Sequence, residues 1–345
     1  MGNRQTYLYT ALVAVLLVLL AASGSVVAQG DEPLSLSLGY SVWVGYGPLF
    51  IAQDQGYFAE EGLNVDLVNV ENPGDRFVAL AGGQLNGLVS TLDTMTQYCN
   101  AESPFKAILA LDESSGGDGI VASADITSID DLRGKKIGVN IGSVSQFFLE
   151  YIFQQNGLTD DDVTLVRMSQ GDVPAALAAG QIDAGVTWEP HLSTAVDNGA
   201  NLLVDSESTP GLIVDIMILR QEVIDEHPEA ATGLVNAWYN AIEYWKANPD
   251  EAATIMAEGL GGFYETADDI NADLGGVNLF DQEANQTFFS GTEAGSALGT
   301  VGFALDFYTN SGVITDPCAP ADMIDSTFVL PEGPIATEEA TEQSG

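Results

Sequence analysis

Basic side chains are scarce in this chain. Its 345 residues include 9 Lys and Arg and 2 His against 50 Asp and Glu, a formal net charge of −41 at pH 7. Nucleic-acid binding requires an extended basic patch that neutralises phosphates, and none is present. So large a charge also repels itself unless salt screens it. We therefore exclude nucleic acid as a partner and interpret the chain as halophilic, the alternative being an ordinary acidic exported protein.

Cysteine is also rare. Cys99 and Cys318 are the only two, which allows one disulfide or two buried thiols. No CxxC pair and no His/Cys cluster with metal-ligand spacing occurs, so we expect no structural metal.

The common catalytic motifs are missing. The sequence has no GxGxxG, no P-loop and no GxSxG elbow. His191 and His227 have no neighbouring Cys or Ser arrangement that indicates a triad. The adjacent carboxylates at 130–131 and 160–162 are typical of solvated helix starts. We predict a binding protein that is not an enzyme and uses no cofactor.

Long apolar runs are confined to the first 28 residues. Arg4 precedes an apolar stretch at 11–22, and small residues fill 23–28, which is typical of a Sec signal peptide cleaved near Ala28. A membrane helix is the alternative, but the run is too short to span a bilayer comfortably. No Cys lies near the cleavage region, so we predict no lipobox and export to the periplasm or another extracytoplasmic space.

The remaining sequence alternates strand and helix patterns, which predicts an α/β fold with mostly parallel sheets. Glycine-rich or polar segments at 114–119 and 206–212 interrupt the alternation. We interpret them as two crossings between two lobes. Lobe 1 would comprise 31–116 plus 212–331 and lobe 2 would comprise 117–211. An acidic segment at 332–345 has little to bury, and we predict that it is disordered.

Two strand-to-helix turns are candidate ligand sites. Gly142, Ser143, Val144 and Ser145 follow a strand at 136–139, and such a turn points N–H groups and a helix dipole at one spot. Ser90 and Thr91, followed by Asp93, repeat the design in lobe 1. Ordinary helix capping by the hydroxyls is the alternative in both cases.

Two tryptophans and two acids complete the candidate site. Trp43 and Trp188 end strands, where open α/β sheets bind ligands, although core packing also explains them. Glu189 could bind an ammonium group, latch the lobes or lie in solvent. Asp215 interrupts the apolar run 212–218 and needs a partner there. That partner is a ligand amine, a backbone N–H or Arg220.

Four segments together carry a family resemblance. They are 48–62 (PLFIAQDQGYFAEEG), 131–143 (DLRGKKIGVNIGS), 175–190 (AALAAGQIDAGVTWEP) and 223–237 (VIDEHPEAATGLVNA). In this order they resemble the solute-binding proteins of ABC importers. The similarity is to the nitrate, sulfonate and taurine group, which also includes binders of thiamine pyrimidine precursors.

The resemblance implies a type II periplasmic-binding-protein fold that closes by hinge motion over a small-molecule ligand. It implies a membrane permease as partner and a monomeric chain. The binding loops would be 43–46, which adds Tyr46, together with 90–91, 142–145 and the Trp188 turn. Asp215 matches a position that holds the amine in taurine-type members. No arginine lies in these loops.

We therefore expect capture of a small sulfonate or taurine-like anion or zwitterion. A thiamine pyrimidine precursor, nitrate or bicarbonate are alternative ligands. A biosynthetic enzyme of the same fold is the alternative class.

Overall fold

The computed structural model describes residues 32–99 and 104–330. The predicted signal peptide at 1–28 and the predicted tail at 332–345 lie outside the described residues. Within those residues, no helix has both the length and the apolar character needed to cross a membrane.

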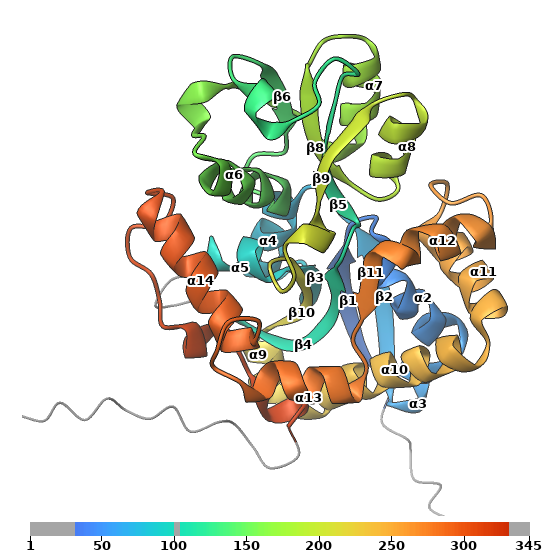
Figure 1. Cartoon of the computed structure of the whole chain (residues 1–345). Helices are drawn as coiled ribbons and strands as arrows, with labels where there is room; N and C mark the ends of the chain where they lie inside the picture. Colours follow the sequence, from blue (N-terminus) through green and yellow to red (C-terminus); the bar gives the residue numbers. More distant parts are fainter. Residues whose placement is uncertain (1–31, 100–103, 331–345) are drawn as a thin grey trace, which may run out of the picture. The chain divides into compact units, whose positions relative to one another are not determined.

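The strands form two sheets (Figure 1). The first has six strands in the order β11-β4-β10-β3-β1-β2, and the second has five in the order β7-β6-β8-β5-β9. The first sheet consists of β1 (Leu34–Tyr40), β2 (Leu63–Asn69), β3 (Gly87–Thr91), β4 (Phe105–Ser114), β10 (Val214–Arg220) and β11 (Val277–Leu279). The second consists of β5 (Asp118–Ala122), β6 (Lys136–Val139), β7 (Thr164–Arg167), β8 (Ala184–Trp188) and β9 (Asn201–Asp205).

The expectation of mostly parallel sheets is wrong, because both sheets are mixed. β1 pairs in parallel with β2 and β3, and β6 with β7 and β8. The strands that flank the two crossings, β4, β5, β9 and β10, form antiparallel pairs. Parallel pairing needs a long return connection. The chain here passes from β4 to β5 and from β9 to β10 through short connections, the second of which contains only the three-residue 3-10 helix η5 (Ser206–Ser208).

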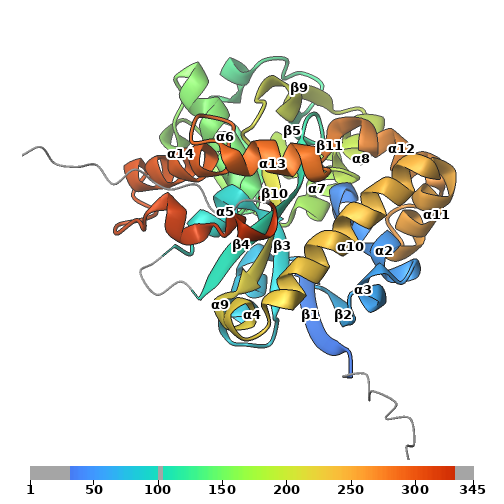
Figure 2. The same cartoon turned by 90° about the horizontal axis from the view of Figure 1, so that it is seen from below.

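Helices cover the sheets, with α6, α7 and α8 against strands of the second sheet and α10, α11 and α2 packed side by side (Figure 2). The helices are α2 (Gly47–Asp54), α3 (Tyr57–Glu60), α4 (Pro73–Ala81), α5 (Leu92–Thr96), α6 (Val144–Asn156), α7 (Val173–Ala178), α8 (His191–Asp197), α9 (Gln221–Glu226), α10 (Pro228–Ala247), α11 (Pro249–Leu260), α12 (Ala267–Asp273), α13 (Gln282–Ser290) and α14 (Ala297–Asn310).

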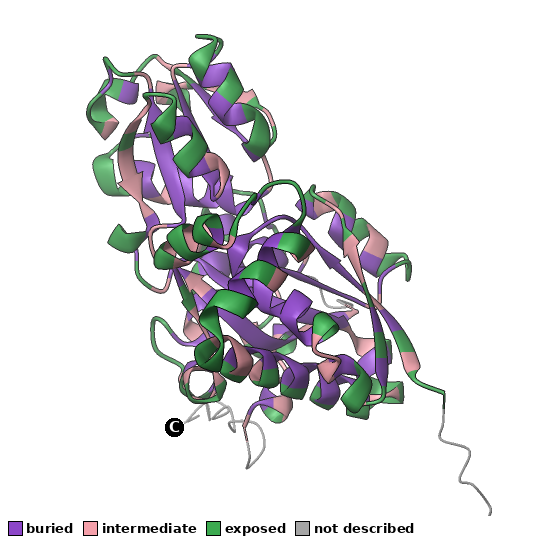
Figure 3. Ribbon diagram, turned by 90° about the vertical axis from the view of Figure 1, so that its right-hand side faces the viewer, coloured by how far each residue is buried: buried purple, intermediate pink, exposed green. Residues whose placement is uncertain are grey.

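The central strands are buried on both faces, whereas the helices expose their outer sides (Figure 3). β3, β5 and β8 are buried along their whole length, and their polar residues, Ser90 and Thr91 of β3, Asp118 of β5 and Thr187 of β8, are therefore buried as well. Trp238 of α10 is fully buried, and its Nε1 donates to the Phe280 carbonyl at 2.9 Å. Such burial stabilises a core indole without leaving its N–H unpaired.

A disulfide joins Cys99, which follows α5, to Cys318, which follows α14. Their Cα atoms lie 5.8 Å apart across a sequence separation of 219 residues. Of the two alternatives left open by the sequence, one disulfide or two buried thiols, the structure has the disulfide. The sequence could not decide between them, because the two cysteines come together only in the folded chain. It fastens the carboxyl-terminal helix α14 to α5, with which it packs.

We predict that the double variant Cys99→Ser/Cys318→Ser unfolds at a lower temperature than the wild type. Closing so long a loop restricts the unfolded chain, and losing that restriction costs about 2–5 kcal/mol. Thermal unfolding of oxidised protein, reduced protein and the variant measures the effect. Equal melting temperatures in all three would show that the bond adds no stability.

Candidate functional site

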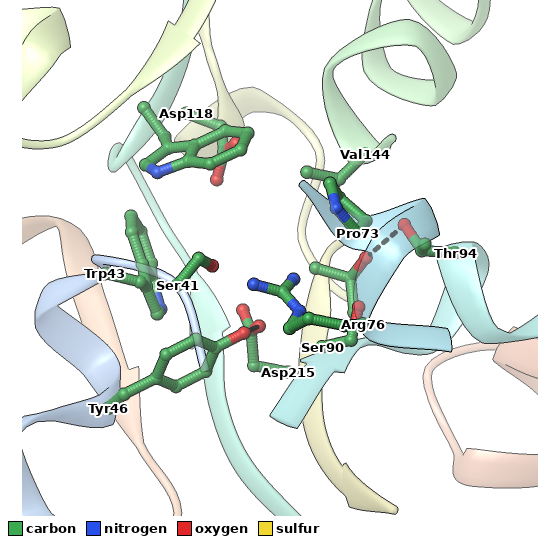
Figure 4. Close-up of a pocket in the computed structure, with 12 residues that line it drawn as sticks. Ser41, Trp43, Tyr46, Pro73, Arg76, Ser90, Thr94, Asp118, Val144 and Asp215 are labelled. Atoms are coloured by element: carbon green, nitrogen blue, oxygen red, sulfur yellow. Dashed lines mark hydrogen bonds between the residues drawn. The ribbon is translucent and has the colours of Figure 1, made fainter. Parts of the chain in front are cut away.

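A cavity lies between residues of both sheets (Figure 4). It offers about 30 Å³ to the centres of water-sized molecules, which is room for roughly two waters or a small ligand group. Its lining residues are Ser41, Trp43, Tyr46, Pro73, Arg76, Ser90, Thr91, Thr94, Asp118, Val144, Trp188 and Asp215.

Trp43 precedes the short 3-10 helix η1 (Val44–Tyr46) that follows β1, and Tyr46 is its last residue. Trp43 Nε1 donates to Asp112 Oδ1 at 3.0 Å, and the Tyr46 hydroxyl donates to Asp215 Oδ1. Both acceptors belong to the first sheet. The two aromatic walls on this side are therefore fixed by hydrogen bonds to buried carboxyls as well as by packing.

Asp215 and Asp112 face each other across the antiparallel pair β10–β4. Both are buried. Burial raises the pKa of Asp215 to about 7, against the hydrogen bond from Tyr46. Burial, followed by the charge of Asp215, raises the pKa of Asp112 well above its usual value. Arg220 is not the partner of Asp215, because it pairs with Glu222 at 2.7 Å.

Arg76 of α4 is the cation of the cavity. Its side chain is buried, and Figure 4 shows the guanidinium pointing into the cavity. Nη1 donates to the Val70 carbonyl at 3.1 Å, while Nε has no partner among the described residues. Burial lowers the pKa of Arg76, and the nearby Asp215 and Glu71 charges raise it. The cavity thus has a charged donor that the sequence expectation lacked.

Trp188 and Asp118 bring the second sheet to the cavity. They stand opposite each other in the antiparallel pair β5–β8. Trp188 Nε1 donates to the Val42 carbonyl at 3.1 Å, which links β8 to the segment after β1. Burial raises the pKa of Asp118 to about 8.

Ser90 and Thr91 line the cavity at the end of β3, where the Thr91 hydroxyl donates to Thr94 Oγ1 at 2.8 Å. Asp93 does not line it. It is buried in α5 and accepts from the Tyr308 hydroxyl at 3.2 Å. Burial raises the pKa of Asp93 to about 6. Asp93 thus links α5 to Tyr308 of α14.

Of the turn at 142–145, only Val144 lines the cavity. The Gly142 N–H donates to Gln146 Oε1 at 2.8 Å, and the Ser145 N–H donates to Ser143 Oγ at 3.2 Å. The Ser143 hydroxyl thus caps α6, as the capping alternative expected. Ser145 Oγ is buried without a partner among the described residues. Ligand binding by this turn stays a prediction.

Glu189 lies beside the cavity without lining it. Its carboxylate accepts from the Ser193 N–H at 3.0 Å and from the Ser193 hydroxyl at 2.8 Å. Burial raises the pKa of Glu189 despite these bonds. Its negative charge also contributes to the raised pKa of Asp273 in α12, after burial.

Five lining residues were not among the sequence candidates: Ser41, Pro73, Arg76, Thr94 and Asp118. Arg76 carried a signal, because it is one of only nine basic residues and lies in an amphipathic helix. Asp118 follows the glycines of the first crossing and reads as an ordinary solvated loop acid. Only its pairing with β8 brings it to the cavity.

The cavity is equipped to bind opposite charges. A guanidinium and two carboxyls face it, with indole rings beside them. Within the described residues, no group of three or more His, Cys, Asp or Glu side chains is arranged to hold a metal ion.

Solved structures show the class of fold. The periplasmic aliphatic sulphonate binding protein SsuA from Escherichia coli aligns with a TM-score of 0.68 at 17% identity, covering 85% of this chain and 97% of that one. Two mixed sheets with helices and an intervening cavity thus form a periplasmic-binding-protein fold, as expected.

The chain belongs to the NMT1/THI5 like family, whose model matches residues 43–252. A putative aliphatic sulfonates-binding protein of Bacillus subtilis (strain 168) is 29% identical over 72% of this chain and 76% of its own length. The taurine-binding periplasmic protein of Escherichia coli (strain K12) is 25% identical over 59% of this chain and 64% of its own.

We predict that the ligand-free protein loses stability as the pH rises from about 4 to about 8. The folded-state pKa of Asp118 is raised to about 8 by burial, so the folded protein holds its proton where the unfolded chain has released it. Stability then falls through this window. Melting temperatures in about 1 M salt, which screens the surface charges, should decline less steeply for Asp118→Asn. If the melting temperatures of wild type and Asp118→Asn fall equally with pH, the raised pKa of Asp118 is contradicted.

Proposed function

We propose that this chain is the extracytoplasmic substrate-binding protein of an ABC importer and delivers a small sulfonate or taurine-like zwitterion to a membrane permease as a monomer. The observation that carries the proposal is the facing of Arg76 and Asp215 into one cavity. A guanidinium suits a sulfonate, and a buried carboxylate suits an ammonium group. The names of the sulfonate- and taurine-binding relatives support the same ligand class.

The residues that line the cavity come from both sheets and their helices, so a bound ligand would contact both sides. Ser90 and Asp215 come from the first sheet and Arg76 from helix α4, which packs on β3 of that sheet. Trp188 comes from the second sheet and Val144 from helix α6, which packs on β8. A ligand that contacts both sets stabilises the state in which they lie together. Hinge motion about the two crossings, within the proposed lobes 31–116 plus 212–331 and 117–211, would admit and release it.

The alternative ligands make different demands on the cavity. Nitrate and bicarbonate are anions with no use for buried carboxylates, so Asp215 and Asp118 disfavour them. A pyrimidine ring would use Trp43 and Trp188 as stacking faces. A same-fold enzyme would turn over such a ligand, and incubation with bound ligand followed by product analysis distinguishes it from a carrier.

A thermal-shift screen at high salt tests the proposal. The panel comprises taurine, alkanesulfonates, nitrate, bicarbonate, pyrimidines and betaines. A ligand raises the melting temperature with its concentration according to ln(1 + [L]/Kd). We expect taurine and short sulfonates to give the largest shifts. A shift with pyrimidines alone would replace the proposed ligand class.

We predict that Asp215→Asn weakens taurine binding by roughly 10- to 100-fold, since a hydrogen bond to a charged group contributes about 1.5–3 kcal/mol. Ethanesulfonate, which lacks the amine, should lose far less. Arg76→Gln should weaken both ligands, because both carry the sulfonate. Titration calorimetry on the three proteins measures this, and equal losses for both ligands in Asp215→Asn would remove the amine assignment.

A further inference from the structure

Asp118 is a cavity residue to which the proposed function gives no contact with the ligand. It is the first residue of β5, only 4% exposed, and lines the cavity beside its cross-strand neighbour Trp188. A buried acid that faces a cavity needs a counter-charge or a proton.

The crossings hold the backbone of Asp118 in place. The N–H groups of Gly116 and Asp118 donate to Ser206 Oγ at 2.7 and 3.3 Å, and Ser206 Oγ lies 2.8 Å from Ser114 Oγ. Ser206 is fully buried where the second crossing begins. Asp118 is therefore presented by a fixed junction of both crossings and not by a loose loop.

Asp215 lines the same cavity from the first sheet, and Figure 4 shows the Arg76 guanidinium beside Asp215, with Asp118 on the opposite side of the cavity. Besides burial, the charges of Asp215, Asp93 and Glu189 raise the pKa of Asp118, and the Ser114 hydroxyl lowers it. The cavity thus carries more negative than positive groups. The buried Nε of Arg76, which has no hydrogen-bond partner in the described part of the chain, separately points to a ligand group at this cavity.

We propose that Asp118 and Asp215, one from each sheet, form a cation-binding subsite that grips a single ammonium-type group of the ligand in the part of the cavity walled by Trp43 and Trp188. The proposal rests on the proposed function in taking this cavity as the ligand site. Asp118 is then the residue that selects ligands bearing a cationic nitrogen over anions of the same shape. The ammonium group replaces protons that the two carboxyls hold in the empty cavity.

Calorimetric titration of three probes tests the subsite. Taurine carries both charges, isethionate replaces the amine with a hydroxyl, and ethanolamine keeps the amine without the sulfonate. The proteins are wild type, Asp118→Asn and the control Asp161→Asn, which removes an equal charge from an exposed position in the 160–162 turn. Titrations in two buffers of different ionisation enthalpy count the protons released.

We expect Asp118→Asn to lower the affinity for taurine at least 10-fold, as loss of a charged hydrogen bond predicts, and to leave isethionate and the control unchanged. Wild type should release protons on binding taurine near pH 7, and Asp118→Asn should release fewer. Because Asp118 and Asp215 each release at most one proton, a wild-type release of more than one proton requires both carboxyls, and this count tests the subsite even if Asp118→Asn does not fold.

The outcomes separate the two proposals. Equal losses for taurine and isethionate, or binding of taurine without proton release, would overturn the subsite and leave a sulfonate-binding protein. Binding of ethanolamine but neither sulfonate, with loss in Asp118→Asn, would support the subsite and overturn the proposed ligand class.

Discussion

The arrangement of residues around the cavity depends on the partners that the carboxyl of Asp215 has inside the buried strand β10. An unsatisfied charge there would cost several kcal/mol. The hydroxyl of Tyr46 donates to it, the guanidinium of Arg76 lies nearby, and Asp112 faces it across the strand pair. These partners come from three separate stretches of sequence. Satisfying one acid thus brings together the segment after β1, helix α4 and the centre of the first sheet.

The crossings extend this arrangement to the second sheet. Because short connections join β4 to β5 and β9 to β10, the strands at the junction run antiparallel and their ends meet beside the cavity. Ser206 ties both crossings together through Ser114 and the Gly116 N–H. Asp118 and Trp188 reach the cavity through this junction, so the topology that breaks the parallel pattern also builds the site.

The donor available to an anion in this cavity is a charged side chain and not the N-terminus of a helix. In the turn at 142–145, the Gly142 N–H donates to the side chain of Gln146 and the Ser145 N–H donates to that of Ser143. Arg76 instead supplies a charged donor to the cavity, which the carboxyls of Asp118 and Asp215 also line. A ligand with charges of both signs can pair with all three groups, whereas a simple anion pairs with Arg76 alone.

Several features followed from the sequence alone. The pattern at 136–139 and the polar turn after it predicted β6 and the start of α6, because local periodicity and capping fix such elements. Trp43, Trp188, Ser90 and Asp215 were candidates from the sequence and line the cavity, although β1 ends at Tyr40, so that Trp43 follows the strand and does not end it as expected. Their role in ligand binding stays a prediction. The tertiary structure decided the pairing of Cys99 with Cys318, the mixed sheets, and the arrival of Arg76 and Asp118 in the cavity. These depend on contacts between residues distant in sequence, which no local pattern encodes.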